Sequence, residues 1–131
     1  CLLSRGLGDV YKRQVSEVPH SIAKLQIKGT EIEPGEVLPL DSEAPLIALD
    51  TSLQMSAGKA AAQAGHASML LAAARETSWV QQWAQADFPL NVRELPREEF
   101  AELAARPETV AVRDAGFTEV APGSTTAIAI A

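Results

Sequence analysis

Apolar residues from position 45 onward are arranged in runs that predict strands. The segment PLIALD, residues 45–50, is a nearly continuous apolar run, which is typical of a strand buried on both faces. Three later segments are predicted as further strands: PLNVREL at 89–95, TVAVRDAG at 109–116 and STTAIAIA at 124–131. The segment DAGFTEVAPGS, punctuated by glycine and proline, joins the last two of these strands.

Helices are predicted between these strands. An alanine-rich segment from about Gly58 to Arg75 predicts a first helix that follows the loop TSLQMSAG. A second helix is predicted for SWVQQWAQA, residues 78–86, with Trp79, Val80 and Trp83 on one side. Proline at position 96 suits the first turn of a third helix, whose expected core stripe consists of Phe100, Leu103 and Ala104.

The alternation of strands and helices indicates an α/β fold. Strands separated by helices imply crossover connections and a sheet covered on both faces, so we expect three α/β/α layers. The sheet is expected to be mixed and mainly parallel, with four strands. The short link between the last two strands allows one antiparallel member.

The first 43 residues follow a different pattern. The segment SRGLGDVYKRQ, residues 4–14, resembles the translation of a transposon-end adapter used in preparing sequencing libraries, so residues 1–14 are expected to be an artefact or a disordered tail. Residues 15–43 are predicted as a short strand around Ile22 to Ile27 and an acidic, proline-rich linker. The folded domain is therefore expected to span residues 44–131.

Composition and charge narrow the classes of function. The chain has 131 residues, is 47% hydrophobic and carries a formal charge of -6, which suits one core and provides no overall basic field for nucleic acid. No DNA partner is expected, and any RNA contact must be local. The longest apolar stretches are far shorter than a membrane span, so we expect a soluble, cytoplasmic protein. Because Cys1 is the only cysteine, a disulfide or thiolate zinc site within the fold is excluded.

Three polar residues interrupt the smooth surface of the alanine-rich helix. Lys59, Gln63 and His66 lie at positions i, i+4 and i+7, which places them on one stripe. The stripe follows a predicted central strand, at the carboxyl end of the sheet, where open α/β folds bind ligands. A phosphate-binding loop is excluded, because Leu53 and Ala60 replace its first glycine and its Ser or Thr.

Each of these residues also has a purely structural interpretation. A lysine in a first helical turn is usually solvated, and a lone histidine on an alanine-rich helix is more often a packing residue than a catalyst. No metal site is expected, because the chain has two histidines and one of them, His20, lies in the amino-terminal region. For Asp114, which precedes Ala-Gly, the structural interpretation is a turn cap.

Two separated motifs together resemble a known family. The segments MSAGKAAAQAGHA at 55–67 and DAGFTEVAPGSTT at 114–126 are similar to motifs of the archaeal and eukaryotic-type peptidyl-tRNA hydrolases. The resemblance extends from about Pro45 to Ala131, with strands and helices in the family's order. It implies a compact α/β domain that hydrolyses the ester joining a stalled peptide to the 3′ ribose of tRNA, with no cofactor.

The resemblance also implies roles for individual residues. Lys59, Asp114 and Thr118 correspond to catalytic positions, with Asp114 positioning or deprotonating water and Lys59 pairing with it or holding negative charge. The positions implied for substrate binding are Gln63, His66 and Thr126, with His66 near the ribose or the terminal adenosine. Because the ester is already activated, orienting water and stabilising the oxyanion suffice for the chemistry.

Two other classes of function stay open at this point. One is a non-catalytic binding module of the same fold, and the other is an interaction domain that forms a homodimer through its sheet edge or its tryptophan-bearing helix. Affinity for tRNA normally depends on phosphate neutralisation by basic residues. From Pro45 onward these are Lys59, Arg75, Arg93, Arg97, Arg106 and Arg113.

Overall fold

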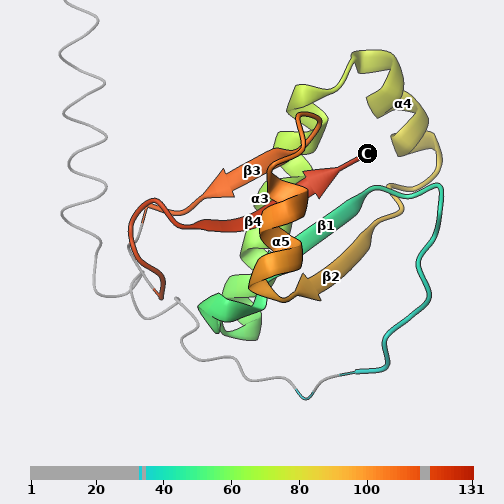
Figure 1. Cartoon of the computed structure of the whole chain (residues 1–131). Helices are drawn as coiled ribbons and strands as arrows, with labels where there is room; N and C mark the ends of the chain where they lie inside the picture. The colour runs from blue at the N-terminus through green and yellow to red at the C-terminus, as the bar shows by residue number, and fades with distance from the viewer. Residues whose placement is uncertain (1–32, 34, 116–118) are drawn as a thin grey trace, which may run out of the picture.

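Four strands form a single mixed sheet in the order β2-β1-β4-β3 (Figure 1). The computed structural model describes Glu33, residues 35–115 and residues 119–131. The strands are β1 (Leu46–Asp50), β2 (Asn91–Leu95), β3 (Val110–Arg113) and β4 (Thr125–Ile130). Each predicted strand between residues 45 and 131 is therefore present.

The pairing of the strands refines the predicted sheet. Strands β1 and β2 pair in parallel, whereas β4 pairs antiparallel with both β1 and β3. Strands β1, β2 and β3 consequently run in one direction and β4 runs against them. The mixed sheet is confirmed, and it is mainly parallel in strand direction, but only one of its three pairings is parallel because β4 lies between β1 and β3.

The described residues form three α-helices, two of which pack on the faces of the sheet (Figure 1). They are α3 (Ala57–Ala74), α4 (Thr77–Gln85) and α5 (Arg97–Ala104), and a short 3-10 turn, η1 (Thr51–Leu53), connects β1 to α3. The three predicted helices are confirmed within a residue or two. Pro96 is the residue before α5 rather than part of its first turn, since helical geometry begins at Arg97.

The core has two parts, one on each face of the sheet. On one face Ile47 and Leu49 of β1 pack with Ala67 and Leu71 of α3. On the other face Ala48 packs with Phe100 of α5 and with Ile128, Leu95, Leu103 and Ala104. Alternate residues of β1 thus point to opposite helical layers, as the pleat of a strand requires. The expected α/β/α layering and the core stripe of the third helix are confirmed.

Helix α3 lies close to the sheet because its buried side is built largely from small residues. Its buried positions are Ala60, Gln63, Ala67 and Leu71, which follow the spacing of one helical face. The contacts of α3 extend to β1, β3 and β4. Gln63 is the one polar residue on this buried face, so its amide needs hydrogen-bond partners at the sheet.

The segment before β1 is attached to the edge strand β2. Glu33 and residues 35–41 contain no helix or strand, in agreement with a linker. The amide of Asn91 at the start of β2 donates to the carbonyl oxygens of Asp41 (2.8 Å) and Ala44 (3.0 Å) and accepts from the Asp41 N–H at 2.9 Å. The predicted tail at 1–14 and the short strand at 22–27 lie outside the described residues. None of the described helices combines the length and apolar character that crossing a bilayer requires.

Candidate functional site

Helix α3 starts beside the carboxyl end of β1, and a serine defines its first turn. The Ser56 side chain is the N-cap, and its Oγ accepts a hydrogen bond from the backbone N–H of Lys59 at 3.3 Å. Serine is among the preferred residues at this position because its hydroxyl satisfies an otherwise unpaired N–H of the first turn. The cap fixes the turn that carries Lys59.

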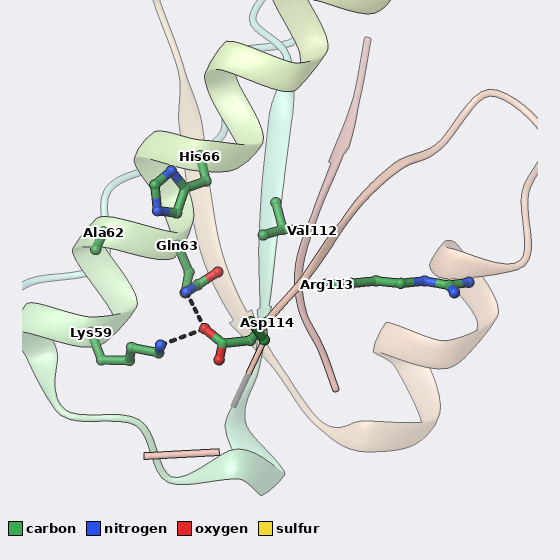
Figure 2. A pocket seen from close by; sticks show the side chains of 8 residues that line it. Lys59, Ala62, Gln63, His66, Val112, Arg113 and Asp114 are labelled. Atoms are coloured by element: carbon green, nitrogen blue, oxygen red, sulfur yellow. Dashed lines mark hydrogen bonds and ion pairs between the residues drawn. The ribbon is translucent and has the colours of Figure 1, made fainter. Parts of the chain in front are cut away.

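Asp114 directly follows β3, and backbone hydrogen bonds hold it in place. Its N–H donates to the carbonyl of Ser124 at 2.9 Å, and its own carbonyl accepts from the N–H of Gly123 at 2.7 Å. Gly123 has a φ of 79°, a left-handed conformation that glycine adopts without strain. The side chain of Asp114 points toward α3, whereas that of Arg113 extends away from it (Figure 2).

The two segments meet in an ion pair between Lys59 and Asp114 (Figure 2). Lys59 Nζ donates to Oδ2 of Asp114, and Gln63 Nε2 donates to the same oxygen at 2.9 Å. The side chains of Lys59 and Asp114 are only 13% and 9% exposed. Poor solvent screening strengthens the attraction between the charges, and it also makes removal of either partner costly.

Gln63 links this ion pair to the sheet. Its Oε1 accepts a hydrogen bond at 2.7 Å from Oγ1 of Thr126, a fully buried residue of β4. The Gln63 amide is therefore oriented with its oxygen toward Thr126 and its nitrogen toward Asp114. Both groups of a buried amide are thereby satisfied, which stabilises one orientation of the Asp114 carboxylate.

A cavity of about 420 Å³ opens beside the pair. Its lining residues come from α3 and from the end of β3, and they are Lys59, Ala62, Gln63, His66, Val112, Arg113, Asp114 and Ala115. His66 is exposed, one turn beyond Gln63 on the same side of the helix (Figure 2). The stripe predicted from the spacing of Lys59, Gln63 and His66 thus borders a single cavity.

The predicted site residues fall into three groups: those at the cavity, one buried behind it, and one outside the described residues. Lys59, Gln63, His66 and Asp114 meet at the cavity, and the Asp114 side chain contacts α3 rather than only its own turn. Thr126 lies behind Gln63, and its surface is buried. The predicted position of Thr118 lies outside the described residues. Among those described, no cluster of three His, Cys, Asp or Glu side chains has the arrangement of a metal site.

A contact between Glu119 and Ser56, beside the ion pair, was not predicted from the sequence. Glu119 accepts hydrogen bonds from the Ser56 N–H at 2.8 Å (Oε2) and from the Ser56 hydroxyl at 2.7 Å (Oε1). These two bonds, with the charge of Lys59, hold the pKa of Glu119 below its usual value. The preference of Ser for helix N-caps was a usable signal for Ser56, but nothing local in the sequence pointed to its bond with Glu119.

The arrangement provides the parts needed for hydrolysis. A carboxylate in a fixed orientation accepts a proton from water, and an adjacent ammonium stabilises negative charge that develops on an oxygen. The cavity is large enough for a small part of a substrate to reach both groups. Metal-independent attack of water on an activated carbonyl is within the reach of such a pair.

Comparisons with known proteins agree with this chemistry. Residues 45–131, which include all the cavity-lining residues, match the family described as peptidyl-tRNA hydrolase PTH2. A peptidyl-tRNA hydrolase of Pyrobaculum aerophilum is 39% identical over 98 residues, covering 64% of this chain and 79% of that protein. The resemblance found in the two sequence motifs is confirmed, and a hydrolase rather than a non-catalytic module is indicated. The chain belongs to the peptidyl-tRNA hydrolase PTH2 family.

Proposed function

We propose that this chain hydrolyses the ester between peptide and tRNA with Asp114 and Lys59 as its catalytic pair. The observation that carries the assignment is their ion pair at the edge of a cavity, within the part of the chain that matches the family. Peptidyl-tRNA is the substrate that the family's reaction requires. Release of tRNA from stalled peptides is the resulting function.

Asp114 is proposed to act on the attacking water. The carboxylate orients a water molecule and takes one of its protons as the oxygen attacks the ester carbonyl carbon. The carbonyl oxygen becomes a tetrahedral oxyanion, which the ammonium of Lys59 stabilises. The bond to the ribose oxygen then breaks, and that oxygen receives the proton that Asp114 took from water, which releases the tRNA and restores the carboxylate.

The neighbouring residues are proposed to support this reaction in different ways. Gln63 keeps Oδ2 of Asp114 engaged, and Thr126 orients Gln63. Both side chains are buried, so we propose that they position the carboxylate, in place of the substrate binding that the family resemblance implied for them. His66, exposed at the cavity, is proposed to contact the ribose or the terminal adenosine. The catalytic role of Thr118 stays a prediction from the family motif.

Location and assembly follow from the proposed substrate. We propose that the chain acts in the cytoplasm, because translating ribosomes supply peptidyl-tRNA there. Formation of a homodimer stays a prediction, and sedimentation of the purified chain measures it directly. Residues 44–131 are proposed as the catalytic domain.

The test is release of peptide from peptidyl-tRNA by the purified chain. We expect release from N-blocked peptidyl-tRNA and little release from aminoacyl-tRNA, measured by separating free tRNA from charged tRNA. The same assay with His66→Ala is expected to show a higher KM and a nearly unchanged kcat. A chain that binds tRNA but releases no peptide would contradict the proposed reaction.

A further inference from the structure

Glu119 connects the two segments that supply the catalytic pair. It lies on the loop after Asp114, and its carboxylate bonds Ser56, which caps the helix turn that carries Lys59. Ser56 and Glu119 are 63 residues apart in the sequence. The contact therefore ties the start of α3 to the loop between β3 and β4, next to the ion pair.

The Ser56 hydroxyl both donates and accepts a hydrogen bond. It donates its proton to Oε1 of Glu119 and accepts the N–H of Lys59. A serine hydroxyl has one proton and two lone pairs, so donation to Glu119 fixes the rotation that presents a lone pair to Lys59. Glu119 thus influences the backbone of Lys59 through one intermediate residue.

The second oxygen of Glu119 strengthens this attachment. Oε2 accepts the backbone N–H of Ser56, one of the helix-start donors that has no partner within the helix. A carboxylate at a helix N-terminus is further stabilised by the helix dipole. Both carboxylate oxygens are accordingly engaged by a single residue, which fixes the Glu119 side chain in direction as well as in distance.

We propose that Glu119 is a positioning residue for hydrolysis, which holds the Lys59 turn and the Asp114 loop in register through Ser56. This inference rests on the proposed function of the Lys59–Asp114 pair. A small misplacement of catalytic groups lowers rates strongly, up to about 100-fold for a shift of roughly 1 Å. Loss of the Glu119 bonds should therefore appear mainly in kcat.

The test compares three variants in the peptidyl-tRNA assay. Glu119→Ala removes both bonds and is expected to lower kcat about 10-fold or more with little change in KM. Glu119→Gln is expected to restore most of the activity, because its amide oxygen accepts the Ser56 N–H and its NH₂ donates to the Ser56 hydroxyl. Glu108→Ala removes an equal charge from an exposed position before β3 and should leave kcat unchanged.

Two further measurements separate positioning from a merely structural role. Hydrogen exchange at the Lys59 amide should accelerate in Glu119→Ala and not in Glu119→Gln. Combining Glu119→Ala with Ser56→Ala should lower kcat little beyond either single change, because both act through the same bonds.

A folded Glu119→Ala variant with unchanged kcat, or with only a lower Tm, would overturn the positioning role while leaving the proposed function intact. Equal losses in Glu119→Ala and Glu119→Gln would also overturn it, because charge rather than hydrogen bonding would then matter. An unmutated chain that releases no peptide would overturn the proposed function itself, and the positioning role with it.

Discussion

Two aspartates lie at the same end of the sheet, where β1 and β3 finish, and each is paired with a cation, yet their surroundings differ. Asp50 ends β1 and Asp114 follows β3, and these strands run in the same direction. Asp50 bonds Arg97 at the start of α5, whereas Asp114 bonds Lys59 at the start of α3. The two ion pairs thus connect the sheet to its two different helical layers.

The difference lies in what else satisfies each carboxylate. Asp50 is 1% exposed, and it accepts two hydrogen bonds from Ser52, N–H at 2.9 Å and hydroxyl at 2.6 Å, besides Arg97 at 2.5 Å. The side chain of Arg97 is 63% exposed, so solvent screens its charge. This pair caps a turn and anchors a helix.

The Asp114 pair differs because both of its members line the larger cavity. A smaller pocket of about 210 Å³ borders Asp50, but neither Arg97 nor any other cation is among its lining residues. At Asp114 the cation, the amide of Gln63 and the imidazole of His66 all line one cavity. A strand-end carboxylate paired with a cation thus occurs twice among the described residues, and shared access to a cavity distinguishes the candidate active site.

The largest difference between the two aspartates is expected when each is substituted by asparagine. Asp114→Asn keeps the shape of the side chain but cannot accept a proton, so cleavage of peptidyl-tRNA should fall by about 10²- to 10⁴-fold. Asp50→Asn should retain cleavage within about twofold per folded molecule, because Asp50 lies outside the reacting groups. Steady-state kinetics on both variants measure the contrast. Turnover like that of the wild type in Asp114→Asn would remove Asp114 from the mechanism.

The two cations give a second contrast. Lys59→Ala should lower cleavage by about 10²-fold through lost stabilisation of the oxyanion. If the ammonium also contacts a phosphate, tRNA affinity should fall and the slope of log K against log salt should decrease by about 1. Arg97→Ala removes the same charge from the other pair and is the matched control. Equal losses of cleavage in both variants would indicate a general electrostatic effect instead of a local one.

Much of the fold was predictable because it depends on local pattern. The continuous apolar run of β1 and the alanine-rich stretch of α3 defined the central strand and its helix within one or two residues. The strand order was not predictable, since the position of β4 between β1 and β3 depends on contacts between distant segments. Helical spacing predicted the stripe of Lys59, Gln63 and His66, but it gave no partner for Gln63.

Within the candidate site, only the residues that belong to the two sequence motifs were predictable. Lys59 and Asp114 were linked by the resemblance of two motifs to a family, since each residue alone has an ordinary structural interpretation. The contact of Ser56 with Glu119 depends on tertiary folding and has no local signal. A strand-end aspartate such as Asp50 is a normal turn residue, and the bonds that it accepts from the N–H and hydroxyl of Ser52 fit that role.

Stability gives the third contrast between the aspartates. Asp50→Asn replaces a buried carboxylate that has charge-assisted hydrogen bonds, so the free energy of unfolding should fall by about 1.5–3 kcal/mol. Urea unfolding at pH 7 measures this loss. An unchanged midpoint would show that the Asp50–Arg97 pair contributes nothing net, as many ion pairs with an exposed member do.

The smallest expected effect is the pH dependence of the unfolding free energy that Asp50→Asn loses. Burial raises the pKa of Asp50, but the hydrogen bonds from Ser52 and Arg97 together lower it by more, so the folded-state pKa lies below the ordinary value of 3.8. A carboxyl group with a lowered pKa contributes stability above its unfolded pKa, and that contribution is lost as the pH falls through the folded value. The difference in unfolding free energy between wild type and Asp50→Asn should therefore be constant at neutral pH and should become smaller below about pH 4. This difference should decrease by no more than about 1.4 kcal/mol per pH unit, the limit for one linked proton. Urea unfolding of both proteins at a series of pH values measures it, and a difference that widens on acidification would contradict the assignment of Asp50 as a stabilising carboxylate.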